Sequence, residues 1–320
     1  MANPVTTILS PKEDFVLLYY VDGDKRLALK YVPVDTNKPV LEYSPYGNPA
    51  GQNITNQSIA AVYLYGLPVV FGQLQVPVSG DVPAKRVLAQ LSPVVQALVD
   101  PANPEDTLFD ERYSAFAAIN SRDQDMAWCY FLKSRSAGEG SPAKITLQEV
   151  KIVGSKTELI EYTDMPDDSQ PDPVSRLAAL YVDQTHREVY YQRKGGNSIY
   201  CYRIGSGSPP SVVPDTGHAM KGTPISVTRS KGGTTYLYYV DKDETEGKTK
   251  IGRVTRDNGE SKWKPSAGIM SEDEVGTIPE TQLAVTHVKC NDELHNVLTF
   301  IPKGGNKKRY EPKRDRGGIA

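Results

Sequence analysis

The chain has 320 residues and a net charge of −2, with 37 Lys and Arg against 39 Asp and Glu. A charge this balanced gives no overall field to attract nucleic acid, and no apolar run reaches the about 18 residues that a membrane-spanning helix needs. Cys129, Cys201 and Cys290 are well separated, so a disulfide framework is not expected.

Aromatic strands recur along the chain roughly every 50–60 residues, a period typical of the blades of a β-propeller. These strands lie within residues 15–29, 67–76, 125–133, 187–204, 234–254 and 294–305. A strand rich in small residues precedes most of them, at 58–65, 113–120, 175–183, 223–230 and 281–288. Ala and Ser suit the innermost strand, where blades converge. The sequence therefore predicts an all-β fold, a six-bladed β-propeller that occupies residues 1–305 as a single domain.

Three segments fall outside this pattern. Residues 6–10 come before the first repeat, and we expect them to pair with the last repeat and close the ring, which would remove exposed edge strands. Residues 84–100 carry apolar side chains at helical spacing, and Ser92-Pro93 suits a helix start, so a short helical insertion is predicted here. Residues 306–320 are basic and rich in Gly, which predicts a C-terminal tail.

The fourth repeat carries a family resemblance. Residues 175–180 (SRLAAL), 189–192 (VYYQ) and 198–199 (SI) closely resemble the repeat of the fungal fucose-specific lectins, which are six-bladed propellers. That resemblance implies sugar sites made of an Arg before the Val-Tyr-Tyr strand, a Glu in the next strand and an aromatic ring. The Arg positions are instead Leu17, Trp128, Glu188 and Tyr236, and the Glu positions are Leu29, Leu147, Cys201 and Arg253. The resemblance thus implies a lectin fold with degenerate sugar sites.

Lectin-like propellers without this motif are also similar to the fungal hetero-Diels–Alderases of tropolonic sesquiterpene biosynthesis. This second resemblance implies a pericyclase of secondary metabolism that joins a tropolone or quinone methide to a humulene-type terpenoid. Such a step needs near-attack geometry and hydrogen bonds to a carbonyl, but no nucleophile, metal or cofactor. The 19 tyrosines, against 6 phenylalanines, could supply apolar walls and hydroxyl donors together.

Under this hypothesis the candidate catalytic donors are Tyr191, Tyr202, Arg203, Tyr236 and Arg253. The candidate substrate-binding residues are Trp128, Glu188 and His287. The motifs His-Glu-x-x-His, Cys-x-x-Cys and Gly-x-Ser-x-Gly are all absent from the sequence. No metal and no cofactor are expected.

Two alternatives stay open: a fucose-type carbohydrate-binding lectin with altered specificity, and a protein-interaction scaffold. The expected partner is a small apolar polycyclic or terpenoid ligand, with no nucleic acid and no membrane, and the chain acts alone or as a homodimer. Residues 1–15 show neither a basic n-region nor an apolar h-region. No secretory signal is therefore predicted, and a cytoplasmic location is expected.

Overall fold

The computed structural model describes thirteen stretches of the chain: residues 4–35, 37–43, 53–55, 58–76, 85–98, 115–135, 144–163, 165–242, 249–260, 262–266, 282–290, 293–300 and 311–315. Within them the protein forms six antiparallel sheets, and the helix present is one short 3-10 turn, η2 (Asp167–Ser169). None of the described segments contains a helix long and apolar enough to cross a membrane.

The first three sheets come from the N-terminal half of the chain. The first sheet has the order β1 (Val5–Leu9), β2 (Phe15–Val21), β3 (Leu27–Pro33) and β4 (Leu41–Tyr43). In the second, β7 (Leu67–Val76) pairs with β5 (Asn53–Ile54), β6 (Ala60–Leu64) and β8 (Lys85–Ser92), which pairs with β9 (Gln96–Ala97). The third has the order β10 (Phe116–Asn120), β11 (Met126–Arg135), β12 (Lys144–Val153) and β13 (Lys156–Tyr162).

The other three sheets follow in chain order. The fourth sheet contains β14 (Ala178–Tyr181), β15 (Arg187–Gln192), β16 (Ile199–Ile204) and β17 (Ser211–Val212). The fifth contains β18 (Ile225–Arg229), β19 (Thr235–Lys242), β20 (Thr249–Arg256) and β21 (Lys264–Ser266). The sixth contains β22 (Ala284–Cys290), β23 (Glu293–Phe300) and β24 (Glu311–Asp315). In these three sheets the spatial order of the strands follows their order in the chain, so each is a simple meander.

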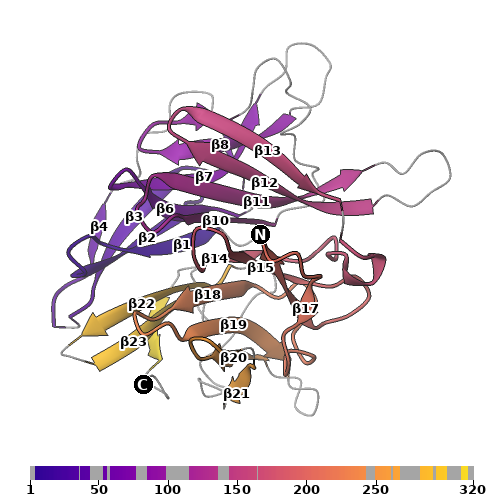
Figure 1. Ribbon diagram of the computed structural model, residues 1–320. Coiled ribbons are helices and arrows are strands. Elements are labelled where there is room, and N and C mark those ends of the chain that lie inside the picture. The colour runs from indigo at the N-terminus through magenta and orange to yellow at the C-terminus, as the bar shows by residue number, and fades with distance from the viewer. Residues whose placement is uncertain are drawn as a thin grey trace.

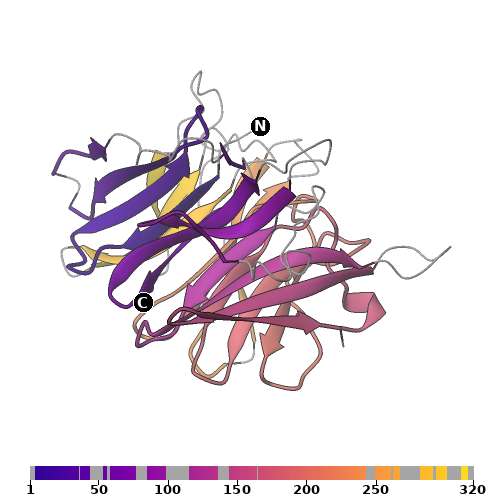
Figure 2. The same ribbon diagram turned by 90° about the horizontal axis from the view of Figure 1, so that it is seen from above.

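The six sheets are arranged around a common centre. Strands β1, β6, β10, β14, β18 and β22 lie innermost, and each contacts the next until β22 meets β1 (Figure 1). Figure 2, the view from above, shows the sheets fanned side by side. The ring closes through side chains, because Thr286 Oγ1 on β22 donates to Thr7 Oγ1 on β1 at 2.7 Å. This is the architecture of a β-propeller, and the predicted all-β propeller class is confirmed.

The core lies between neighbouring sheets. On β15, Val189 and Tyr191 pack with Tyr130 of the third sheet, while Tyr190 packs with Leu237 of the fifth. Because successive side chains of a strand point to opposite faces, one middle strand contributes to two separate clusters. A strand buried on both faces has no polar side, which explains the nearly continuous apolar runs in the sequence.

The predicted helical insertion over residues 84–100 is wrong, since β8 and β9 occupy the described part of this range. Val87, Ala89 and Leu91 of β8 pack toward the first sheet, and Leu88 packs toward the third. Burial on both faces places apolar residues at adjacent as well as alternate positions, and this happens to imitate helical spacing. Val94, which the helical pattern counted as apolar face, is 64% exposed.

Both ends of the chain also differ from the prediction. The strand predicted within residues 6–10 does not pair with the last repeat: β1 pairs with β2, in the register Leu9 opposite Val16, and is the innermost strand of the first sheet. Part of the range predicted as a tail, residues 306–320, belongs to the sixth sheet, because β24 pairs with β23 and the Asp315 side chain is buried.

The close approach of Gly205 to the turn before β15 gives a testable prediction. Gly205 has φ +87°, and a Cβ there would lie 2.0 Å from the carbonyl oxygen of Thr185. Gly207, with φ +67° and open space around it, is the matched control because Ala at either site pays the same left-handed backbone cost. We expect Gly205→Ala to lower the free energy of unfolding by about 1–3 kcal/mol more than Gly207→Ala, as overpacking does. Equal losses in denaturant titrations would contradict this.

Candidate functional site

Buried ion pairs link the sheets at three successive junctions. Glu149 of β12 meets Arg187 of β15 at 3.2 Å, between the third and fourth sheets. Glu188 of β15 meets Arg256 of β20 at 2.6 Å, between the fourth and fifth. Arg253 of β20 pairs with Asp315 of β24, between the fifth and sixth. Burying a charge costs free energy unless the charge is paired and hydrogen-bonded. These three junctions therefore stand out as places where paired charges interrupt an otherwise apolar core.

Aromatic rings enclose the first pair. The Nε atom of Arg187 donates to the Tyr130 hydroxyl at 2.9 Å, and its guanidinium lies 4.7 Å from the centroid of the Trp128 ring. The Tyr162 hydroxyl donates to Glu149 at 2.9 Å, and the Tyr162 ring meets Tyr202 edge-on. Two of the predicted site residues, Trp128 and Tyr202, are therefore packing partners of this pair.

The third pair belongs to a hydrogen-bonded chain of side chains. The Tyr238 hydroxyl donates to Asp315 at 2.8 Å, and Asn296 Nδ2 donates to Tyr238 at 2.6 Å. Asn296 Oδ1 lies 2.7 Å from His287 Nδ1, so the chain runs from Arg253 to His287. Two predicted site residues, Arg253 and His287, thus connect the fifth and sixth sheets.

Tyr191 and Tyr236, both predicted as donors, are buried phenols. The Tyr191 hydroxyl donates to the Ser169 carbonyl at 2.6 Å, and the Tyr236 ring stacks on His287 with centroids 6.3 Å apart. Burial raises the pKa of both phenols above the ordinary value. The structure places these two residues in the core, at different sheet junctions.

The second pair, Glu188–Arg256, differs because it forms part of the wall of an open groove between the fourth and fifth sheets. The groove measures about 510 Å³, within the range of about 300–1,000 Å³ that is usual for ligand pockets. Two predicted residues, Glu188 and Arg203, lie together here. Its other polar lining side chains include Asp183, His186, Arg229, Arg256, Asp257 and Glu260.

Glu188 is a charged carboxylate at the base of this groove. Its Oε2 accepts hydrogen bonds from Arg256 Nη2 at 2.6 Å and from the Tyr190 hydroxyl at 2.5 Å, and its Oε1 accepts one from Arg203 Nε at 3.2 Å. Burial alone would raise the pKa of Glu188, but the hydrogen bond and the charge of Arg256 outweigh burial, so this pKa lies below its ordinary value. The groove therefore presents a fixed acceptor beside two guanidinium groups.

The three arginines of the groove are used differently. All three nitrogens of Arg229 donate to the protein, to Gly233, Val182 and Asn258, so Arg229 holds the wall in place. The Arg203 side chain is 40% exposed, and in the part of the chain that the structure describes its two terminal nitrogens have no partner. Arg256 is 8% exposed, and its Nη1 is buried and unpaired among the described residues. Of the three, Arg203 is therefore the arginine whose exposed terminal nitrogens can donate to a ligand, beside Glu188.

Sequence reasoning missed Arg256, a member of this site, and Trp263, which packs on Arg256. The Arg256 guanidinium lies 4.8 Å from the centroid of the Trp263 ring, whose edge also meets Tyr190. The available signal was the alternation of faces along β20, since Arg253 and Arg256 are separated by an odd number of positions and point to opposite sheets. Only Arg253 was chosen as a candidate, and it points away from the groove.

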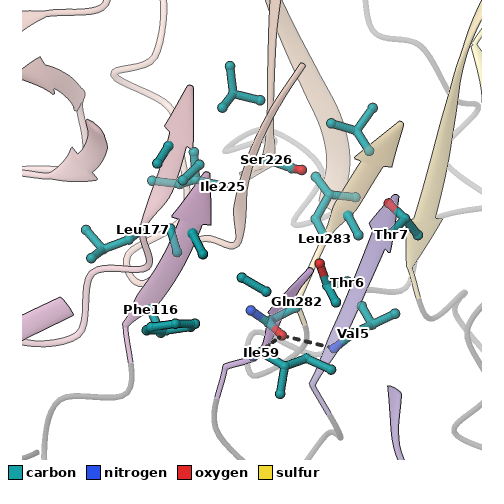
Figure 3. A pocket seen from close by; sticks show the side chains of 18 of the residues that line it. Val5, Thr6, Thr7, Ile59, Phe116, Leu177, Ile225, Ser226, Gln282 and Leu283 are labelled. Atoms are coloured by element: carbon teal, nitrogen blue, oxygen red, sulfur yellow. Dashed lines mark hydrogen bonds between the residues drawn. The ribbon is translucent and has the colours of Figure 1, made fainter. Parts of the chain in front are cut away.

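A second cavity lies at the centre of the ring, where the innermost strands meet (Figure 3). It measures about 180 Å³, below the usual size of a ligand pocket, and its lining includes Ile59, Phe116, Leu177 and Leu283. The amide of Gln282, which lines this cavity, is already bonded within the protein, because its Oε1 accepts from the backbone N–H groups of Val5 and Ile59 at 2.9 and 3.4 Å. The groove is therefore the stronger candidate for a ligand site.

The described ranges contain no candidate metal site. They contain no group of three or more His, Cys, Asp or Glu side chains that could hold a metal ion. Cys129, Cys201 and Cys290 are buried free thiols. Burial raises the pKa of Cys201 to about 12 and that of Cys129 well above its ordinary value, so both stay protonated and are poor nucleophiles.

No model of a known protein family matches the chain. The chain is 24% identical over 318 residues to a wall-associated proteinase of Coccidioides posadasii, covering 97% of this chain and 94% of that protein. It is 25% identical over 263 residues to a wall-associated proteinase of Coccidioides immitis, covering 80% of this chain and 79% of that protein.

Solved structures with a similar fold include lectin propellers. AofleA from Arthrobotrys oligospora superposes with a TM-score of 0.64 at 12% identity, covering 98% of this chain and 86% of that chain. A mutant of Aleuria aurantia lectin in complex with alpha-methyl-L-fucoside also gives 0.64, at 14% identity, covering 100% of this chain and 97% of that chain. Similarity at these sequence identities establishes the fold alone, so any ligand has to be inferred from the groove itself.

The buried carboxylate predicts a pH-dependent stability. Glu188→Gln leaves Arg256 buried without a counter-charge, so we expect a loss of about 3–5 kcal/mol in unfolding free energy at pH 7. The folded pKa of Glu188 lies below the ordinary 4.5, so its contribution is complete above that value and disappears as the pH falls through the lowered folded pKa. The difference in unfolding free energy between wild type and Glu188→Gln should therefore become smaller in this acid range.

Denaturant titrations from pH 7 down to pH 3 would measure this difference in unfolding free energy. The range of about 4 pH units spans the ordinary pKa values of carboxylates. Glu260→Gln is the matched control, because Glu260 lines the same groove but its side chain is 46% exposed, with an ion pair to Lys264 at 3.4 Å. Exposed pairs contribute little, so this variant should follow wild type closely. A gap for Glu188→Gln that stays constant with pH would refute the assignment.

Proposed function

We propose that this chain is a carbohydrate-binding β-propeller and that the groove at Glu188 binds a neutral sugar of the fucose type. One observation carries the proposal: an acceptor, Glu188 Oε1, lies beside the unpaired terminal nitrogens of Arg203 in an open groove. Neighbouring hydroxyl groups of a sugar need one partner of each kind, a donor toward one oxygen and an acceptor for the next proton. Hydrogen bonds to charged groups are the strong ones, which suits a small neutral ligand.

The charge of the groove fits an uncharged sugar. The groove is lined by the guanidinium groups of Arg203, Arg229 and Arg256 and by the carboxylates of Asp183, Glu188, Asp257 and Glu260, so neither sign dominates. A ligand without charge loses little on entering such a site, and its hydroxyls replace the water that the exposed polar groups would otherwise hold. Specificity then comes from the positions of the donors and acceptors.

The comparisons support this reading in two ways. Both lectins named above share the fold, and the structure of Aleuria aurantia lectin holds alpha-methyl-L-fucoside. The two Coccidioides proteins are named for an association with the wall, which agrees with a chain that meets polysaccharide. Proteolysis through a cysteine has less support, since the pKa values of Cys129 and Cys201 are raised by burial.

The cycloaddition inferred from the sequence has less support than sugar binding. The hydroxyl of Tyr191, one of its candidate donors, already donates to the Ser169 carbonyl, and Tyr236 is 1% exposed. Arg253 is occupied by Asp315, and Trp128 stacks with Arg187. None of the proteins reported above is named as a cyclase.

Calorimetric titration with methyl α-L-fucoside tests the proposal. Wild type should bind, and Arg203→Ala should weaken binding by at least about tenfold, the equivalent of one charge-assisted hydrogen bond. Arg26→Ala is the matched control, because Arg26 is 42% exposed and paired with Asp22, as Arg203 is 40% exposed and paired with Glu188. It should leave the affinity unchanged. Failure of wild type to bind this or any other neutral monosaccharide would overturn the proposal.

A further inference from the structure

A further pocket, distinct from the central cavity, shares Arg203 with the groove. It measures about 390 Å³, and Arg203 lines both spaces. The second space, which we call the Trp263 pocket, is lined by Cys201, Arg203, Ser211, Val212, Pro214, Lys262 and Trp263. The two spaces are therefore neighbours that share one guanidinium group.

The Trp263 pocket has an apolar wall suited to a sugar ring. The indole of Trp263 has the Arg256 guanidinium 4.8 Å from its centroid and meets the ring of Tyr190 at 84°, so these contacts fix its orientation. Val212 on β17 adds a side chain that is 49% exposed, and Pro214 follows it in the same lining. A rigid aromatic face with exposed aliphatic neighbours stacks on the C–H face of a pyranose while leaving its hydroxyls in water.

The charge of the two spaces differs. The groove mixes arginines with four carboxylate residues, whereas the Trp263 pocket is lined by Arg203 and Lys262 and by no acidic residue among those described. Lys262 is exposed, and within the described part of the chain it has no ion-pair partner. Arg203 pairs with Glu188, but that carboxylate lines the groove and not the Trp263 pocket, so the lining of this pocket carries a net positive charge, which favours an anionic group.

We propose that the groove and the Trp263 pocket form one extended site for an acidic oligosaccharide, and this rests on the proposed function of the groove. A neutral terminal sugar occupies the groove at Glu188. The next unit stacks on Trp263 and directs an anionic substituent, a carboxylate or a sulfate, toward Lys262 and Arg203. Arg203 thereby contacts both units, with its Nε bound to Glu188 and its terminal nitrogens facing the ligand.

Calorimetric titration of the whole chain with four probes tests this inference. The probes are methyl α-L-fucoside, a neutral fucosyl disaccharide and disaccharides of the same linkage carrying a sulfate or a uronate on the second unit. The acidic disaccharides should bind at least about tenfold tighter than the monosaccharide, as one additional charge-assisted contact would give. The difference should shrink as NaCl rises, because the added contact is electrostatic and exposed. Whichever acid gains more identifies the substituent.

Lys262→Gln isolates the second unit. It should remove most of the gain for the acidic disaccharides and leave the affinity for the monosaccharide unchanged. Lys194→Gln is the matched control, since Lys194 is an exposed lysine in the turn after β15 and lines neither space. Val212→Asp provides a second variant, because it adds a negative charge to the pocket wall and should repel the same probes.

The outcomes separate the two proposals. If the monosaccharide binds but the acidic disaccharides bind no tighter, or if Lys262→Gln keeps their full gain, the extended site is wrong and sugar binding in the groove stands. If no probe binds wild type, both proposals fall together. A gain that requires Lys262 and vanishes in Val212→Asp supports the extended site.

Discussion

Every middle strand of this ring is buried on both faces, and the rest of the structure depends on that constraint. Adjacent residues of a strand must face different neighbours, so Arg187 turns to Glu149 of the third sheet while Glu188 turns to Arg256 of the fifth. Arg253 and Arg256 divide between the sixth and fourth sheets in the same way. A single strand thus supplies charges to two junctions, each compensated from a different sheet.

What surrounds a buried pair decides what it can do. Where Trp128 and Tyr130 contact Arg187, the ion pair is a fixed element of packing. At Glu188 the pair lines an open groove, and in the proposed function this carboxylate and the neighbouring arginines form the recognition group. The same kind of ion pair is therefore enclosed by aromatic side chains at one junction and borders an open groove at the next, where we propose that it binds a ligand.

The repeat of aromatic and small-residue strands was enough to predict an all-β propeller and the innermost strands of the second to sixth sheets, because both follow from local composition, whereas β1 of the first sheet was assigned to the last repeat. The strand at Lys85–Ser92 was beyond that reasoning, since two-sided burial and helical amphipathicity give overlapping apolar patterns over so short a range. Glu188 and Arg203 were chosen from the sequence as separate candidates, and the structure brings them together. Their partner Arg256 was not chosen, because it lies 68 positions from Glu188 and pairing between sheets has no signature within one repeat.

Ring closure by side chains has a consequence for how such a chain assembles. Among the described strands, no sheet combines residues from both ends of the sequence, and β1 and β22 meet through Thr7 and Thr286. Each sheet can therefore acquire its backbone hydrogen bonds from one continuous stretch of chain, at low contact order, before its neighbours are complete. Ring closure is then the packing of the first sheet against the sixth after both have formed. The loss of chain entropy on closure is offset in that single step by the contacts between these two sheets.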